Sequence, residues 1–361
     1  MAEATALFTR RPSPLPEEES HMSVTTVPGV TIASLLQEPE GSCTKDWLRT
    51  SLQVAVQLEF ATIPPYLYAY WSVVDPAAEL ADALLGIAWQ EMLHMGLACN
   101  MLTAAGGKPK IKGEAAPKYP GGLPGDVRRG LVIPLQGVST VVKDPEDALK
   151  TFVDIEQPEK TVLMAIDGPT IGQFYARIAK ELPGIAAREG FGGRRQLTGR
   201  IGGDKLEPIH TVDDALKAIK LICEQGEGTS QSPSGGVDPA ELAHFYRFAE
   251  HWEGRRLERR KPPHEDKWAF TGEEIKRPAL HLLAKVPKGG WTGVGGDLGD
   301  ALAKCNTEYR QVLADLESGW DGPDGVADVN PYVGAMFGLN AAVKHLIGIQ
   351  SEPTCGPDFR A

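Results

Sequence analysis

Several features that would assign a function at once are missing from this sequence of 361 residues. Its five cysteines are scattered and include no Cys-x-x-Cys pair, which disfavours a zinc site or a dithiol redox motif and is typical of a reduced, cytoplasmic protein. No window approaches 18 uninterrupted apolar residues, so we expect no membrane-spanning helix. The first 23 residues also lack the apolar core of a signal peptide.

An excess of positive charge is missing as well. The 37 basic residues face 48 acidic ones, and the resulting net charge of -11 repels phosphate backbones and anionic lipids alike. We therefore expect neither a nucleic acid nor a membrane as a partner.

Composition divides the chain into three parts. Residues 1–28 are expected to be a disordered leader, because the Pro- and Glu-rich stretch 11–19 has almost nothing to bury. Residues 29–260 carry long helical periodicity and are expected to form one bundle with inserted helices and loops. Residues 261–361 turn to Pro, Gly and Trp before two amphipathic segments, which predicts a helical accessory region packed on the bundle.

Apolar periodicity and capping residues predict an all-α fold built on a four-helix bundle with additional helices and long covering loops. The four bundle helices are expected at 44–70, 76–105, 211–226 and 239–258, and shorter or accessory helices at 146–156, 171–182, 298–316 and 332–349. The stretch 131–135 is expected to be a short strand or an extended cover, and the Gly-rich stretch 190–203 is a candidate lid.

Acidic and histidine side chains interrupt the inward stripes of the first two bundle helices. Steps of four and three place the following residues on one face of the first helix: Leu48, Leu52, Ala55, Glu59, Thr62 and Tyr66. The same steps place a second set on one face of the next helix: Leu80, Leu84, Ile87, Glu91, His94, Ala98 and Met101. Glu59, Glu91 and His94 are therefore expected to point into the bundle.

Buried carboxylates need a counter-charge. Burying a carboxylate costs on the order of 5 kcal/mol or more unless the group is paired or binds a metal ion. The i, i+3 spacing of Glu91 and His94 lets one helix present an oxygen and a nitrogen to the same ion, as in di-iron carboxylate bundles. The stripes thus predict a metal site.

The di-iron architecture requires a second half-site, made of another single Glu and another Glu-x-x-His on two later helices. Glu241 and His244 supply the second Glu-x-x-His. For the single Glu on the third helix we expect Glu227, which lies closer to the apolar stripe than Glu224, although the glycines beside it leave Glu224 as the alternative. Glu156 lies on the inward step of its short helix and is a candidate partner for Arg247.

Longer segments of the chain resemble a known family. LEFATIPPYLYAYWS around Glu59, EMLHMGLACNMLTAAGGKP around Glu91 and His94, FVDIEQPE, PTIGQFYARI, ICEQGEG, ELAHFYRF and CGPDFRA are similar to the ferritin-like domain of iminophenyl-pyruvate dimer synthases of bisindole pathways such as that of violacein. The resemblance covers nearly everything after residue 30. This chain differs from the dimer synthases in being far shorter, and it resembles a free-standing version of their ferritin-like domain.

The resemblance implies a ferritin-like fold and a metal-dependent oxidative role in secondary metabolism. It carries the metal ligands over onto these residues: Glu59, Glu91, His94, Glu227, Glu241 and His244. We expect two iron ions, with manganese or another divalent metal as the alternative. The leading hypothesis is a non-haem di-iron oxidoreductase or oxygenase that uses dioxygen to oxidise a small, amino-acid-derived molecule, as a monomer or small homo-oligomer. The alternatives are a dimer synthase of the bisindole type and non-catalytic iron binding or storage.

Overall fold

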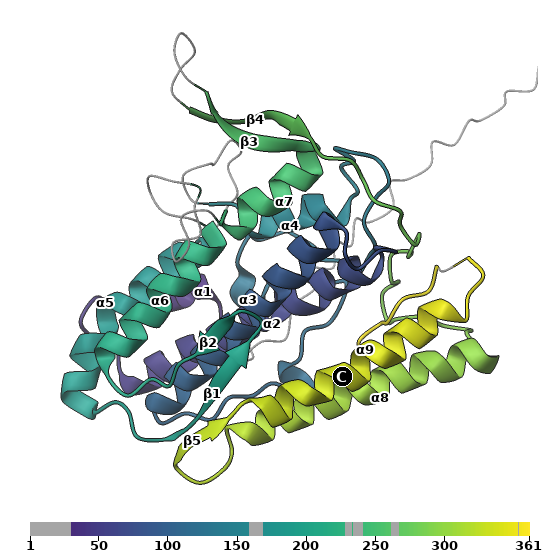
Figure 1. Ribbon diagram of the computed structural model, residues 1–361. Coiled ribbons are helices and arrows are strands. Elements are labelled where there is room, and N and C mark those ends of the chain that lie inside the picture. Colours follow the sequence, from purple (N-terminus) through teal and green to yellow (C-terminus); the bar gives the residue numbers. More distant parts are fainter. Residues whose placement is uncertain (1–29, 159–168, 228–232, 234–240, 261–266, 353) are drawn as a thin grey trace, which may run out of the picture.

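A computed structural model describes residues 30–158, 169–227, 233, 241–260, 267–352 and 354–361 (Figure 1). Most of these residues are helical, as the all-α prediction requires. The helices are α1 (Ile32–Gln37), α2 (Lys45–Trp71), α3 (Glu79–Ala104), α4 (Ala148–Ile155), α5 (Ile171–Glu189), α6 (Val212–Glu227), α7 (His244–Glu253), α8 (Gly296–Gly319) and α9 (Asn330–Gly348), with short 3-10 turns η1 (Gly113–Ala115) and η2 (Pro124–Asp126).

The bundle is formed by two long helices and two pairs of shorter ones. α2 packs along α3, while α5 lies beside α6 and α4 lies beside α7 (Figure 1). The helices of these two pairs contact α2 and α3. Each of the two remaining sides of the bundle is therefore formed by two short helices instead of one long helix. The C-terminal end of α4, which Glu156 caps, and the N-terminal end of α7, which begins at His244, both lie at the centre of the bundle.

Thr44 caps the start of α2, and its hydroxyl accepts a hydrogen bond from the backbone N–H of Trp47. The helix continues through Pro64 and Pro65, which lack the N–H groups that would bond to the carbonyls of Phe60 and Ala61. Tyr119 replaces one of these donors, because its hydroxyl donates to the Ala61 carbonyl at 2.7 Å. The proline pair therefore does not end the helix that carries Glu59.

Two small sheets lie outside the bundle. β1 (Arg195–Ile201) pairs antiparallel with β2 (Asp204–Leu206) and parallel with β5 (Gly325–Asp328), and β3 (Arg255–Arg260) forms a hairpin with β4 (Lys267–Glu274). The three-stranded sheet is held on α3 by the buried Asn100, whose side chain bonds to the N–H and the carbonyl of Leu197. Trp320, just after α8, donates to the same asparagine.

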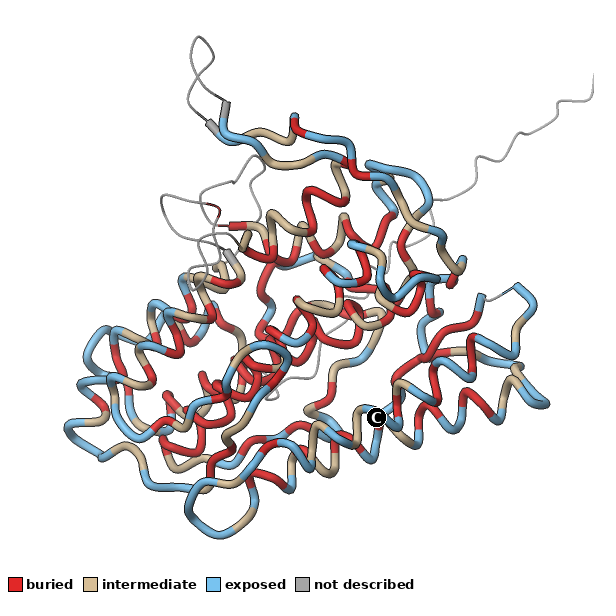
Figure 2. Tube along the Cα trace, viewed as in Figure 1, coloured by how far each residue is buried: buried red, intermediate tan, exposed pale blue. Residues whose placement is uncertain are grey.

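Two helices near the C-terminal end of the chain, α8 and α9, lie outside the bundle (Figure 1). α8 and α9 pack along each other as a helical hairpin (Figure 1). Trp71 of α2 donates its indole N–H to Asn340 of α9 and stacks on Phe359 at a centroid distance of 6.0 Å. Buried residues concentrate where these layers meet, and the outer faces of α8 and α9 are largely exposed (Figure 2).

The structure corrects several element boundaries. Residues 190–203 were expected to be a loop but contain strand β1, which packs on α3, while 131–135 form the extended alternative, with an isolated bridge between Gly121 and Ile133 in place of a regular strand. The helix expected at 239–258 starts later and ends earlier, because α7 spans His244–Glu253 and β3 follows it. α1 was not predicted. None of the helices in the described ranges has both the length and the apolar composition needed to cross a bilayer.

Candidate metal centre

Five ligand-type side chains meet at the centre of the bundle, and each is at most 7% exposed. They come from α2, α3, the end of α4 and the start of α7, and are Glu59, Glu91, His94, Glu156 and His244. Their atoms form two groups that could each hold a metal ion, and Glu91 belongs to both groups. Such an arrangement of carboxylates and histidines is typical of dinuclear carboxylate sites.

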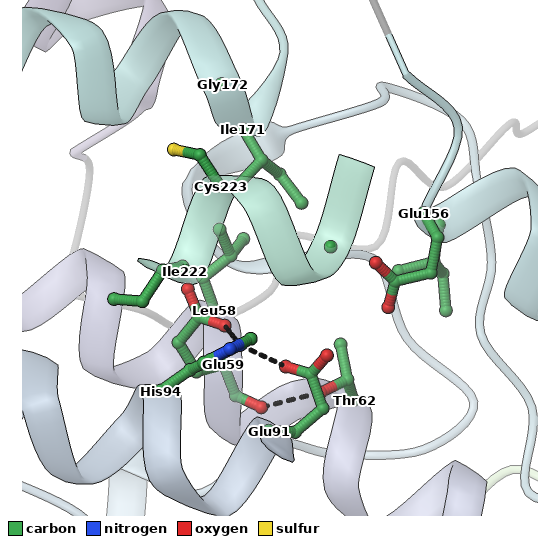
Figure 3. A pocket seen from close by; sticks show the side chains of 12 residues that line it. Leu58, Glu59, Thr62, Glu91, His94, Glu156, Ile171, Gly172, Ile222 and Cys223 are labelled. Atoms are coloured by element: carbon green, nitrogen blue, oxygen red, sulfur yellow. Dashed lines mark hydrogen bonds and ion pairs between the residues drawn. The ribbon is translucent and has the colours of Figure 1, made fainter. Parts of the chain in front are cut away.

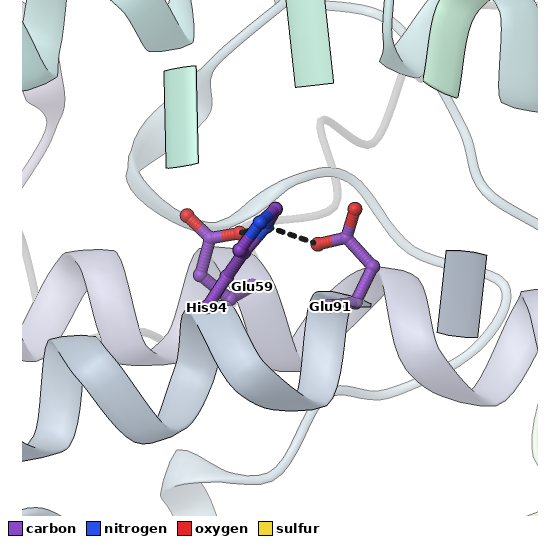
Figure 4. Close-up of side chains that lie close together, drawn as sticks. All are labelled: Glu59, Glu91 and His94. Atoms are coloured by element: carbon purple, nitrogen blue, oxygen red, sulfur yellow. Dashed lines mark ion pairs between the residues drawn. The ribbon is translucent and has the colours of Figure 1, made fainter. Parts of the chain in front are cut away.

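The first group contains Glu59, Glu91 and His94. Nδ1 of His94 lies 3.6 Å from Oε2 of Glu59 and 3.6 Å from Oε2 of Glu91, so the ring nitrogen stands between the two carboxylates (Figure 4). Glu91 and His94 project from consecutive turns of α3, whereas Glu59 approaches from α2. The i, i+3 spacing therefore brings the carboxylate of Glu91 and the ring of His94 together on one face of α3.

The second group contains Glu91, Glu156 and His244. Nδ1 of His244 lies 2.8 Å from Oε1 of Glu91 and 3.8 Å from Oε2 of Glu156. Figure 3 shows the Glu156 carboxylate pointing from the end of its helix toward the carboxylate of Glu91. The rings of His94 and His244 are stacked with a centroid distance of 5.6 Å. One oxygen of Glu91 thus faces each histidine.

Both histidines bond to a glutamine through the outer nitrogen of the ring. Nε2 of His94 lies 2.7 Å from Oε1 of Gln225 on α6, and Nε2 of His244 lies 3.1 Å from Oε1 of Gln90 on α3. An amide oxygen only accepts, so Nε2 carries the hydrogen of each ring. In a neutral imidazole this leaves the Nδ1 lone pair directed at the carboxylates, which is the arrangement a metal ligand needs.

His244 provides the test of whether a cation fits. Among the described residues its Nδ1 has no hydrogen-bond partner, although the atom is buried and close to two carboxylates. A buried polar atom without a partner costs about 1–3 kcal/mol. A cation between Nδ1 and the two carboxylates would satisfy all three groups, so the donor set fits a metal ion.

The protonation of the cluster without a metal points the same way. Burial raises the pKa of Glu59, and burial together with the neighbouring Glu91 raises the pKa of Glu156 well above the ordinary value. Burial alone would also raise the pKa of Glu91, but the two nearby histidines outweigh it and lower that pKa. The raised pKa values of Glu59 and Glu156 indicate that the surroundings of these carboxylates hold too little positive charge to offset burial. Divalent ions would supply that charge.

Comparison with known proteins now places the chain. A family model described as ferritin-like matches residues 52–252, which include every residue of the two groups. The chain belongs to the ferritin-like family. A crystal structure of a ferritin-like protein from Caulobacter vibrioides aligns with 86% of this chain and 97% of its own length, at 20% sequence identity and a TM-score of 0.58, and is similar in fold. No curated protein matches the chain.

Four of the six expected ligands of this ferritin-like chain lie in the two groups: Glu59, Glu91, His94 and His244. Glu241 does not, because it precedes α7 and its carboxylate accepts from Arg247 at 3.0 Å instead. Glu227 is the last residue of α6, and its side chain lies outside the described part of the structure. The alternative, Glu224, lies 3.7 Å from Lys220 and belongs to neither group.

Glu156 completes the second group and was expected only as a partner of Arg247. It follows the last residue of α4, and its other oxygen accepts a hydrogen bond from Tyr66 at 2.5 Å. The available signals were its inward position after Leu149 and Phe152 and the FVDIEQPE segment. Tyr175 similarly donates to Glu59 at 2.5 Å, so each terminal carboxylate of the cluster is held by a tyrosine.

A cavity of about 30 Å³ adjoins the cluster, enough for one or two water-sized molecules. Apart from the cluster itself its walls are mainly apolar (Figure 3). They include Leu58, Thr62, Ile155, Ile171, Ile222 and Cys223.

Proposed function

We propose that this ferritin-like protein binds two transition-metal ions, most readily iron, in the buried cluster. Glu59, Glu91 and His94 would hold one ion, Glu156, Glu91 and His244 the other, and Glu91 would bridge them. The observation that carries the proposal is that Glu91 directs one carboxylate oxygen toward each histidine. Carboxylate and imidazole ligands suit iron and manganese, and zinc is the alternative.

We further propose that the metal centre is catalytic. A bound iron pair supplies redox chemistry with dioxygen. The chain keeps the reaction out of bulk water, because the cluster is buried and the cavity beside it has room for only one or two water-sized molecules. The hydroxyls of Tyr66 and Tyr175 orient the two terminal carboxylates. These features favour an oxidoreductase over a passive binding site.

A small molecule is the proposed substrate. The segments that resemble iminophenyl-pyruvate dimer synthases, including FVDIEQPE around Glu156, support an amino-acid-derived compound of secondary metabolism, and a dimerising synthase is the closest alternative reaction. The family match and the fold support a metal-dependent role at the coarser level of a ferritin-like protein.

Metal analysis tests the centre directly. The protein is purified without oxygen, reconstituted with ferrous iron and assayed for iron per chain. We expect about two ions in the wild type, as two half-sites require. Glu156→Ala should lose about one of them, whereas Glu224→Ala should keep both, because Glu156 faces His244 in the cluster while Glu224 lies beside Lys220 and belongs to neither ligand group. Equal loss in both variants, or less than a tenth of an ion in the wild type, would contradict the assignment.

Oxygen uptake tests the catalytic part. The ferrous wild type should consume oxygen slowly alone and faster with its substrate, screened among amino acids, indoles and related oxidisable compounds. Glu91→Ala, which removes the bridging ligand, serves as the control for free iron. If no small molecule changes the uptake of the loaded wild type, the enzyme proposal fails while the metal centre stands.

A further inference from the structure

Glu241 was expected as a ligand, yet it belongs to a closed ring of hydrogen bonds behind His244. Its Oε1 accepts from Nη1 of Arg247 at 3.0 Å and from Nε2 of Gln90 at 3.3 Å. Nη1 of Arg247 also donates to Oε1 of Gln90 at 3.0 Å, which closes the ring. Oε1 of Gln90 in turn faces Nε2 of His244 at 3.1 Å.

The ring determines which way the amide of Gln90 points. A guanidinium only donates and a carboxylate only accepts, so the amide oxygen must face Arg247 and the amide nitrogen must face Glu241. With this orientation the oxygen accepts the hydrogen on Nε2 of His244. The Nδ1 lone pair is then directed at the cluster. If the amide of Gln90 were turned over, its N–H groups would face two other donors, the guanidinium of Arg247 and the Nε2–H of the His244 imidazole.

The other histidine lacks such a ring. Gln225 bonds to His94 from α6, but among the described residues no charged pair holds its amide. The ring of hydrogen bonds around Gln90 reaches the protein surface at Glu241, whose side chain is 42% exposed. The Arg247 side chain is more buried, at 17% exposed. The two half-sites therefore differ in how their histidines are positioned.

We propose that Arg247, with Glu241 and Gln90, is a positioning unit that orients His244 and so makes one of the two metal sites selectively dependent on Arg247. This inference rests on the proposed function, since it concerns the affinity of the same centre. Arg247 belongs to neither ligand group, and its hydrogen-bonded path to His244 runs through Gln90. Outer partners of this kind typically change metal affinity by about 10–100-fold.

Cobalt(II) is the probe, because its visible absorption reports the ligands around each ion. The full chain is titrated with cobalt(II) alone, without oxygen. We expect two binding steps in the wild type and, in Arg247→Met, about tenfold weaker binding in one step only. In a His244→Ala background, which keeps the Glu59, Glu91 and His94 site, adding Arg247→Met should change nothing further. Arg256→Met is the matched control, because Arg256 pairs with Glu250 and does not reach Gln90.

Three variants separate positioning from a general loss of structure. Gln90→Leu should weaken the same binding step as Arg247→Met, and Gln90→Glu should restore it because a carboxylate also accepts from Nε2. Gly86→Ala places a Cβ 3.0 Å from Nη2 of Arg247 and should shift that step in the same direction but less. Alanine favours a helix over glycine, so this last variant should not lower the melting temperature.

The outcomes distinguish the two proposals. If the wild type takes up no cobalt, the metal centre itself is refuted and the inference with it. If the wild type binds two ions and Arg247→Met binds them equally well, or weakens both steps alike, the metal centre stands and the positioning unit is refuted.

Discussion

α7 carries two buried histidines with different surroundings. His244 begins the helix inside the cluster, whereas His251 lies two turns later, with Nε2 3.9 Å from a carboxylate oxygen of Glu79. Burial lowers the pKa of His251 to about 4, and nearby arginines such as Arg256 add to the effect while Glu79 opposes it. The folded protein therefore holds His251 in its neutral form.

This shift predicts a pH dependence of stability. The unfolded chain binds a proton at His251 near its ordinary pKa of about 6.5, but the folded chain does so only near pH 4. The stabilisation is complete above the higher value and is lost as the pH falls from about 6.5 toward 4. At pH 5 the loss amounts to about 2 kcal/mol.

Urea unfolding of metal-free protein at pH 7 and pH 5 measures this loss. Between these pH values the free energy of unfolding should fall by about 2 kcal/mol more in the wild type than in His251→Gln, which cannot take up the proton. His345→Gln, at an exposed position on α9, should behave like the wild type. An equal fall in wild type and His251→Gln would show that His251 does not titrate in this window.

At the same scale, the sequence predicts those ligands whose position depends on one continuous helix. Glu59, Glu91 and His94 follow apolar residues at steps of three and four, and local periodicity is enough to direct them inward. Glu156 and Glu241 stand just outside helices, where periodicity alone cannot distinguish a residue of the cluster from one that pairs elsewhere. Tertiary contacts decide between them, and these place Glu156 on the cluster and Glu241 on Arg247.

Among the elements, the capped starts of α2 and α5 and most helix ends were predicted well, whereas the ends of α5 and α7 were not. Thr44 and Thr170 cap α2 and α5 close to the expected starts. α7 was expected to continue past Gly254, but this residue has a φ of 68° and ends the helix in a left-handed conformation. Residues beyond it pair with β4, a contact that the sequence alone does not reveal.

The proline pair in α2 leads to a prediction at this scale. Because Pro65 has no N–H, Tyr119 is the donor to the buried Ala61 carbonyl. Tyr119→Phe should therefore lower the free energy of unfolding by about 1–2 kcal/mol. In Pro65→Ala protein, where the new backbone N–H can bond to Ala61, the same change should cost less.

Thermal or urea unfolding of the four proteins completes a double-mutant cycle. Tyr309→Phe is the matched control, because its hydroxyl is buried without a hydrogen-bond partner among the described residues. A cost of Tyr119→Phe that is unchanged by Pro65→Ala would mean that the hydroxyl acts independently of the missing helix donor.

For the whole molecule, the parts outside the bundle decide which surfaces are available for assembly. The α8 and α9 hairpin covers part of α2 through Trp71 and Asn340, and the three-stranded sheet covers part of α3 through Asn100 (Figure 1). Composition predicted an accessory region but not where it would pack, because no local pattern encodes contacts over such sequence distances.

These coverings predict that the protein does not assemble into an iron-storage shell. Subunits of a closed shell must meet through several outer faces of a compact bundle, and here two such faces are already occupied by the chain itself. Size-exclusion chromatography with light scattering should therefore show one or a few copies of the 38.9 kDa chain. Iron loading under air should level off near two ions per chain, because the cluster has two half-sites. Mineral growth needs an enclosed volume that a small oligomer does not have. A particle of many hundred kDa that binds ferric ions far beyond this ratio would therefore refute the enzyme proposal and indicate an iron-storage protein.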